Sequence, residues 1–244
     1  MGSSVFYQGG STEAVCCGAE YLRQQGICFS DAPSDLVTDL MLDIPSFSAP
    51  GILRSGKALG ELLKQLPENV RIWGGNLPPS VIGQDLLQDP GYLQENAAIT
   101  ADCALRLCGL SLKTTWKDSR VLVIGWGRIG KCLCRLLRAM GSQVTVCARK
   151  ESDRALLSAF GYGTIEPAEL DGNGYQILFN TAPATVMTED ALGDCPLPMD
   201  LASKEGLAGK RVIRARGLPG IYAPVTSGKL IGSTILKKLG GDST

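Results

Sequence analysis

The chain alternates short apolar runs, each of strand length, with longer stretches in which apolar residues recur every three or four positions. Short apolar runs predict strands buried on both faces, and the helical spacing predicts amphipathic helices. The predicted strands are residues 36–44, 70–73, 120–124, 144–148, 176–179, 197–201 and 212–215, and the predicted helices are residues 13–25, 58–66, 92–109, 129–140 and 226–239. This alternation indicates an α/β fold with parallel sheets.

The predicted elements fall into two parts joined by a long helix. Residues 1–91 are expected to form a small N-terminal α/β domain, and residues 92–110 a linking helix. Residues 111–244 are expected to form a Rossmann domain, which is a doubly wound parallel sheet that binds a dinucleotide. The closing helix, residues 226–239, is a candidate to pack back on the first domain.

A glycine-rich turn directly follows the apolar strand 120–124. The turn consists of Gly125, Trp126, Gly127, Arg128, Ile129 and Gly130. In this G-x-G-x-x-G pattern Gly125 allows the tight turn, Gly127 lets the backbone approach a pyrophosphate, and Gly130 lets the helix pack against the strand. We therefore expect residues 125–130 to bind a nicotinamide dinucleotide, with a glycine turn that holds no ligand as the plainer alternative.

The end of the next strand bears on which dinucleotide is bound. NAD-binding folds usually place an acidic residue there, for the ribose 2′-hydroxyl. Here Arg149 and Lys150 follow the strand, and two cations suit the 2′-phosphate of NADP. Because Glu151 and Asp153 lie close by, NAD stays possible, and two solvated charges at a strand end are the plain alternative.

Later strand ends supply further cofactor candidates, because ligands of doubly wound sheets bind at the carboxyl ends of the strands. These candidates are Asn180, Thr181, Ala182, Pro183, Leu201 and Pro219. Asn180 and Thr181 suit contacts with ribose or nicotinamide, although a simple Asn/Pro turn explains them equally well. Pro219 lies in the segment 217–224, whose two glycines and two prolines predict a rigid loop.

The candidates for catalysis are fewer. Lys204 follows the predicted strand 197–201 and is suited to binding a carboxylate or to proton transfer, with a surface loop lysine as the alternative. Ser203 and Asn96 complete the catalytic candidates. The chain has no histidine, which excludes an imidazole base and most zinc chemistry, so no metal site is expected.

Composition limits the expected binding partners and the expected compartment of the protein. The 24 basic and 24 acidic residues give a net charge of zero, which offers no bulk attraction to nucleic acid or to anionic membrane. No apolar run is long enough for a transmembrane helix. The nine cysteines include no C-x-x-C pair, so we interpret them as small buried apolar residues in a reducing cytoplasm.

Several segments, in order along the chain, resemble the A subunit of dipicolinate synthase, a family of spore-forming bacteria. The segments are residues 95–101, 121–130, 144–150, 179–183, 200–204 and 217–224. The last two are the most specific, because a generic dinucleotide fold needs neither of them.

The resemblance implies an NADP-dependent oxidoreductase that forms pyridine-2,6-dicarboxylate from a dihydrodipicolinate-type precursor during sporulation. It also implies two domains similar to those of formate/glycerate dehydrogenases, and a partner, the flavoprotein-like dipicolinate synthase B subunit. A small dicarboxylate substrate would require cations or backbone amides in the active site. We further expect a homo-oligomer.

Two other functions compete with this one. Another two-domain NAD(P)-dependent dehydrogenase has a similar pattern, but 2-hydroxyacid dehydrogenases rely on an imidazole that this chain lacks. A non-catalytic NADP-binding regulatory or scaffolding subunit is the third possibility, because the sequence offers no compelling catalytic acid or base.

Overall fold

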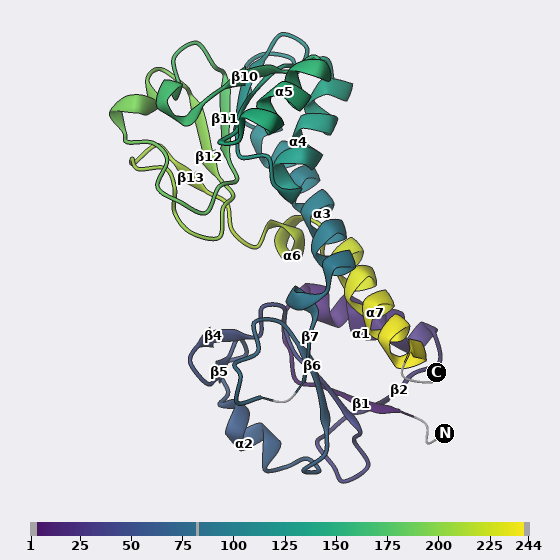
Figure 1. The fold of residues 1–244 in the computed structure, drawn as a ribbon. Helices are drawn as coiled ribbons and strands as arrows, with labels where there is room; N and C mark the ends of the chain where they lie inside the picture. The colour runs from purple at the N-terminus through teal and green to yellow at the C-terminus, as the bar shows by residue number, and fades with distance from the viewer. Residues whose placement is uncertain (1–3, 82, 242–244) are drawn as a thin grey trace. The chain divides into compact units, whose positions relative to one another are not determined.

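The structure, a computed structural model, describes residues 4–81 and 83–241 and divides into two compact units. The first unit holds the chain up to Asn96 and again from Pro219, and the second holds Ala97–Leu218. The chain passes from the first to the second within helix α3 (Pro90–Gly109) and returns in the short helix α6 (Leu218–Tyr222) (Figure 1).

The first unit is built on a parallel sheet with the strand order β2-β1-β3-β6-β7. Its elements are β1 (Val5–Gln8), α1 (Glu13–Gln24), β2 (Cys28–Ser30), β3 (Asp39–Met41), β4 (Phe47–Ala49), β5 (Ile52–Leu53), α2 (Leu59–Leu63), β6 (Arg71–Gly74), β7 (Gly83–Asp85), η1 (Leu86–Gln88) and α7 (Pro224–Gly241). Strands β4 and β5 pair separately as an antiparallel hairpin. Renumbered along the chain, the main sheet has the order 2-1-3-4-5, which is one of the two common doubly wound orders.

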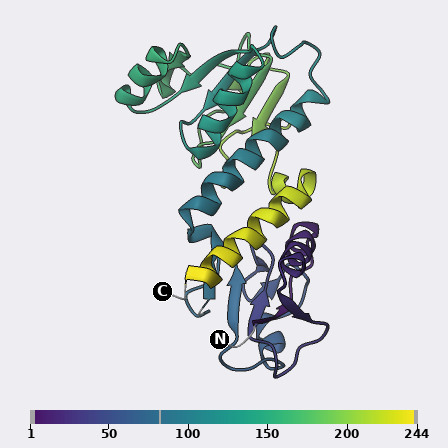
Figure 2. The same cartoon turned by 90° about the vertical axis from the view of Figure 1, so that its right-hand side faces the viewer.

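Helices α1 and α7 pack unusually close together in the first unit (Figures 1 and 2). Gly228 and Gly232 of α7 face Gly18 and its neighbours in α1. A Cβ atom at Gly228 would lie 2.5 Å from the Cβ of Cys17 and 2.6 Å from the carbonyl oxygen of Ala14. Only residues without a side chain allow the two backbones to approach this far.

The second unit is a six-stranded parallel sheet with the order β10-β9-β8-β11-β12-β13. Its elements are β8 (Arg120–Ile124), α4 (Arg128–Ala139), β9 (Gln143–Cys147), α5 (Glu151–Ala159), β10 (Gly163–Ile165), η2 (Pro167–Glu169), β11 (Ile177–Asn180), η3 (Asp190–Leu192), β12 (Leu197–Asp200) and β13 (Ile213–Arg214). Renumbered along the chain, this order is 3-2-1-4-5-6, the Rossmann order. The predicted α/β class with doubly wound sheets is therefore confirmed.

The two faces of the second sheet are covered differently. Helices α4 and α5 lie on one face, whereas the connections that follow β11 and β12 cross the other face without a long helix (Figure 1). These connections still bury apolar side chains, among them Met187, Leu192 and Leu207, against Leu122 and Leu178 of the sheet. Irregular segments therefore complete the core where a Rossmann fold normally has helices.

Some predictions for individual elements were wrong. Residues 217–224 were expected to form a rigid loop, but residues 218–222 form helix α6. The closing helix begins at Pro224, two residues before the predicted start at residue 226. Among the cysteines, Cys16 and Cys28 are exposed, whereas the prediction had all nine buried. None of the described helices is both long and apolar enough to cross a membrane.

The α1–α7 contact leads to a stability prediction. Replacing Gly228 by Ala should lower the free energy of unfolding by about 3 kcal/mol, because the added methyl group meets backbone that cannot move aside. Chemical denaturation of both proteins measures this difference. Gly240→Ala in the same helix is the control, because a Cβ there meets nothing within 4 Å. It should change stability by at most about 1 kcal/mol, in the stabilising direction. Equal denaturation midpoints for the two variants would contradict the close packing.

Candidate functional site

The candidate site of the second unit lies where its strand order reverses. Strands β8 and β11 are neighbours there, and the chain leaves them in opposite directions along the sheet. The backbone N–H of Thr181, just after β11, donates to the carbonyl oxygen of Ile124 at 2.8 Å. The Thr181 hydroxyl donates to the same oxygen at 2.9 Å. The two segments that follow these strands are thus fastened together at the position where doubly wound folds bind ligands.

The three glycines of the turn have different surroundings. Gly125 has a φ of 103°, and a Cβ there would lie 2.6 Å from the Thr181 hydroxyl oxygen. A Cβ at Gly130 would collide with the carbonyl oxygen of Gly125. A Cβ at Gly127, in contrast, would meet nothing within 4 Å. Gly125 and Gly130 are therefore required by the fold, whereas Gly127 leaves open space in front of the first turn of α4, where a ligand can approach the backbone.

A cavity of about 620 Å³ opens above this turn. Its lining includes the predicted residues Gly125, Trp126, Gly127, Arg149, Lys150, Thr181, Ala182 and Pro183. It also includes Asp153, whose position in the sequence was a reason to consider NAD, and residues that the sequence did not suggest, namely Ile124, Cys147, Ala148, Pro167, Leu170, Ala184, Thr185 and Val186. The structure thus brings the segments that follow four strands, β8, β9, β10 and β11, around one space, which is cationic at Arg149 and Lys150 and apolar at Pro167 and Leu170.

The cationic end of the cavity lies after β9. Arg149 and Lys150 are both exposed, and neither forms an ion pair with any carboxylate in the described part of the chain. Asp153 also lines the cavity, from the first turn of α5. Glu151 stands in the same turn. Two unpaired cations beside an open space suit an anionic group such as a phosphate.

The remaining predicted cofactor residues do not line the cavity. Arg128 is exposed and Ile129 half-buried in the first turn of α4, while Gly130 is buried beneath them. Leu201 is buried in the core. Pro219 belongs to the first unit, in α6.

Asn180 is fully buried, so its structural setting differs from the contact expected for it. Its Nδ2 donates to the carbonyl oxygen of Ala182 at 3.2 Å and to Oδ1 of Asp200 at 3.1 Å. Its Oδ1 accepts from the backbone N–H of Ala182 at 3.0 Å. Asn180 therefore shapes the turn that lines the cavity and does not face the cavity itself.

The catalytic candidates are not gathered in this cavity. Ser203 and Lys204 are exposed, in a segment held at its base by the buried carboxylate of Asp200. That carboxylate accepts from the backbone N–H groups of Ala202 at 3.1 Å and Gly206 at 2.7 Å. Asn96 lies in α3, within the first unit. Among the described residues, no group of three or more His, Cys, Asp and Glu side chains could hold a metal ion.

The first unit has its own reversal of strand order, between β1 and β3, but a carboxylate of the protein fills it. Asp43 is buried and accepts from the backbone N–H groups of Ser11 at 3.1 Å and Thr12 at 2.8 Å. It also accepts from the Thr12 hydroxyl at 2.6 Å. The amides that precede α1 are thus used internally, unlike those at the start of α4.

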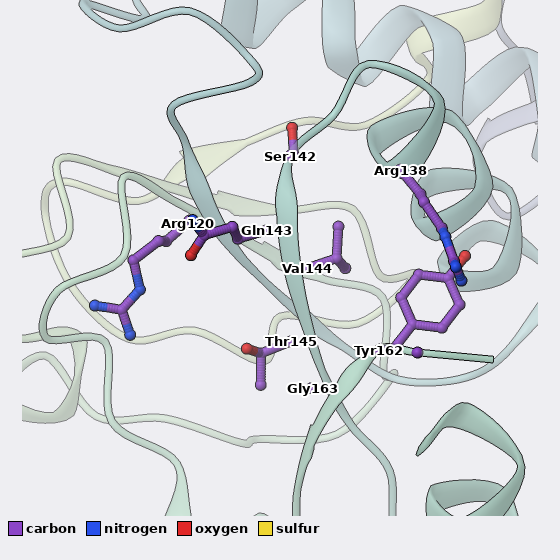
Figure 3. Close-up of a pocket in the computed structure, with 9 residues that line it drawn as sticks. Arg120, Arg138, Ser142, Gln143, Val144, Thr145, Tyr162 and Gly163 are labelled. Carbon is purple, nitrogen blue, oxygen red and sulfur yellow. The ribbon is translucent and has the colours of Figure 1, made fainter. Parts of the chain in front are cut away.

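A second hollow of the second unit, of about 460 Å³, lies at the opposite, amino-terminal ends of β8, β9 and β10 (Figure 3). Arg120 and Arg138 line it on the two sides of β9. The Arg138 guanidinium lies 5.1 Å from the centre of the Tyr162 ring and donates to the carbonyl oxygen of Phe160. This hollow lies at the carboxyl ends of α4 and α5 and not at a helix start, so we do not interpret it as the dinucleotide site.

The chain was compared with known proteins in sequence and in fold. No protein-family model matches the chain. The A subunit of dipicolinate synthase from Bacillus subtilis (strain 168) is 29% identical over 157 residues, which are 59% of this chain and 53% of that protein. The crystal structure of the corresponding A subunit from Bacillus halodurans has the same fold, with a TM-score of 0.82, 21% identity and 98% of each chain covered. The chain resembles the dipicolinate synthase A subunit, as its sequence predicted.

Two facts define the extent of this similarity. The aligned sequence spans about half the length of the B. subtilis protein. The fold is also shared more widely. A D-isomer specific 2-hydroxyacid dehydrogenase from Xanthobacter autotrophicus Py2 has a TM-score of 0.53 at 16% identity, covering 98% of this chain and 97% of that one. The predicted likeness to the formate/glycerate dehydrogenase fold is therefore confirmed.

The surroundings of the cysteines give a prediction about thiol reactivity. Burial raises the pKa of Cys147, beside the cavity, to about 11, and that of Cys108 and Cys134 to about 12. Since only the thiolate reacts, these three should resist iodoacetamide at pH near 8 in the folded protein, whereas the exposed Cys16 and Cys28 should be alkylated. Peptide mass spectrometry distinguishes the sites, and unfolding in denaturant should make all five react. Rapid labelling of Cys147 in the folded protein would contradict its burial.

Proposed function

We propose that the chain is a dipicolinate synthase A-type subunit, an NADP-dependent oxidoreductase. The proposed reaction removes two electrons and two protons from a dihydrodipicolinate-type ring and gives pyridine-2,6-dicarboxylate. The observation that carries this proposal is the cavity above residues 125–127, with Arg149 and Lys150 at one end, in a chain that resembles that subunit. Action during sporulation, together with a flavoprotein-like B subunit, is part of the same proposal.

The residues around the cavity fit a nicotinamide dinucleotide. The open space at Gly127, in front of the first turn of α4, suits the pyrophosphate, because backbone N–H groups and the helix dipole favour negative charge there. Pro167, Leu170 and Val186 offer an apolar surface suited to the adenine ring. Arg149 and Lys150 suit the 2′-phosphate. When bound, the cofactor would accept the hydride that leaves the ring.

In the proposed reaction the residues of this chain hold and orient the cofactor and the substrate. Thr181 and Ala182, positioned by Asn180, would border the nicotinamide half, because they lie above the reversal of strand order. Lys204 stays a proposed carboxylate contact or proton carrier for the dicarboxylate substrate, and Ser203 and Asn96 stay proposed contacts for it. Each of the three can be tested by substitution to Ala, with binding of the dinucleotide as the measurement that should not change.

The structure also gives one reason to consider a subunit without catalysis of its own. Asp153 is the only carboxylate that lines the cavity among the described residues, and it stands at the cationic end beside Lys150. No acid or base lines the part of the cavity near Thr181. A purely NADP-binding regulatory or scaffolding subunit is therefore the second candidate function.

A substitution at Arg149 tests the choice of cofactor. Arg149→Ala should weaken binding of NADPH by about 10- to 100-fold, because a hydrogen bond to a charged group contributes about 1.5–3 kcal/mol. Binding of NADH should stay within about 2-fold of the parent, since that nucleotide lacks the 2′-phosphate. Isothermal titration calorimetry of both nucleotides on both proteins measures the ratio. If the ratio of the two affinities is the same in parent and variant, the chain does not use Arg149 to recognise NADP.

A turnover assay separates the two candidate functions. The purified chain is mixed with dipicolinate synthase B subunit, NADP and a dihydrodipicolinate precursor, and NADPH formation is followed by absorbance. We expect turnover that disappears in Gly127→Val, whose side chain enters open space and should block the cofactor without harming the fold. Circular dichroism checks that the variant is folded. Binding of NADPH by the parent without any turnover would favour the non-catalytic subunit.

A further inference from the structure

The segment between β9 and α5 carries the proposed recognition of the 2′-phosphate, yet its two cations are exposed. An exposed arginine loses side-chain freedom when it binds a ligand, and this loss weakens binding. Selectivity between two nucleotides therefore depends on how firmly the backbone beneath Arg149 is held. The structure shows which side chain holds it.

Arg154, one turn into α5, folds back on this segment. Its Nη1 donates to the carbonyl oxygen of Ala148 at 2.8 Å and to that of Arg149 at 3.0 Å. One nitrogen of the Arg154 guanidinium thus holds the backbone of both Ala148 and Arg149. The Arg154 side chain is only 22% exposed, its bond to Ala148 is partly buried, and its bond to Arg149 lies at the surface.

The second terminal nitrogen of the same guanidinium lies near the residue that follows β10. Nη2 of Arg154 lies 3.7 Å from Oε2 of Glu166, which follows β10. The backbone N–H of Glu166 donates to the side chain of Glu169 at 2.9 Å, which closes a short capped turn over η2. Pro167 and Leu170 of this turn line the cavity. Arg154 therefore connects the cationic wall of the cavity with its apolar wall.

We propose that Arg154 is a positioning residue that sets the selectivity for NADP over NAD. It holds the main chain of Arg149 so that this cation is aimed at the cavity before the nucleotide arrives. This inference rests on the proposed function. Lysine cannot replace it, because an ammonium group lacks the planar fork that reaches two carbonyl oxygens and a carboxylate together.

The contacts of Arg154 separate positioning from direct recognition. Its Nη1 is shared between two backbone carbonyls, and its Nη2 is directed at Glu166. Arg154 is not among the residues that line the cavity, whereas Arg149 and Lys150 are. Arg154 should therefore influence the nucleotide only through Arg149.

A double-mutant cycle tests this dependence. NADPH and NADH are titrated by calorimetry into the parent, Arg154→Ala, Arg149→Ala and the double variant. Arg154→Ala should weaken NADPH by about 5- to 30-fold, within the range for residues coupled in one network, and leave NADH within about 2-fold. In the Arg149→Ala background the same substitution should have no further effect on NADPH.

Two outcomes would overturn the proposal. Equal weakening of both nucleotides by Arg154→Ala would mean that the residue only supports the fold. Additive losses in the double variant would mean that Arg154 acts independently of Arg149. Failure of the proposed function gives a different result, since Arg149→Ala by itself would then leave the NADPH affinity unchanged.

Two further variants guard against loss of folding. Arg154→Lys keeps the charge and the packed stem, and should fold like the parent while losing NADPH affinity as Arg154→Ala does. Arg135→Ala is the matched control, because Arg135 is an exposed arginine on α4 that does not line the cavity. It should leave both affinities unchanged. Full NADPH affinity in a folded Arg154→Lys variant would show that charge alone suffices and would overturn the positioning role.

Discussion

The close approach of the glycine turn to the end of β11 is the constraint on which the candidate site depends. No side chain fits at Gly130 against the carbonyl oxygen of Gly125, and the hydroxyl of Thr181 lies where a side chain at Gly125 would be. The backbone N–H and the hydroxyl of Thr181 both bond to Ile124, which joins the exits of β8 and β11. Because these two exits are held together, helix α4 starts directly at the cavity and presents its amides there.

The two units differ in what occupies the position where the strand order reverses. In the first unit the buried carboxylate of Asp43 accepts from the amides before α1, so the protein supplies its own anion. In the second unit the turn before α4 contains no carboxylate, and Gly127 borders open space. An anionic ligand is therefore favoured at the second position, because no side chain of the described residues caps the start of α4.

The glycine turn and the cationic end of the cavity could be predicted from the sequence because their signals are local. Strand, glycine turn, helix and second strand follow one another within residues 120–148, and each has its own pattern. The residues that were missed lack such patterns. Pro167 and Leu170 follow β10, a strand of three residues that begins with glycine, and Val186 lies in an irregular connection. Their place in the cavity is set by long-range packing, which periodicity does not report.

The role of Asn180 illustrates the same limit. An asparagine at a strand end predicts a polar contact, and the structure shows one with Asp200 of the next strand. Asp200 in turn holds the segment that carries Ser203 and Lys204, so one buried pair shapes the exits of two strands. The sequence could indicate that these positions matter, but it could not indicate that Asn180 and Asp200 would be bonded to each other.

The acidic residues near Arg149 have a structural explanation that bears on the choice of cofactor. Glu151 and Asp153 stand in the first turn of α5, where negative charge stabilises a helix through its dipole. Neither occupies the end of β9, which is the position of the acid that contacts a ribose 2′-hydroxyl in NAD-binding folds. Ala148 and then Arg149 follow that position, and the carbonyl oxygen of Arg149 accepts from Arg154. The acids are therefore accounted for by the helix, whereas Arg149 and Lys150 form no ion pair with a carboxylate of the described residues, which leaves that end of the cavity suited to an anionic group.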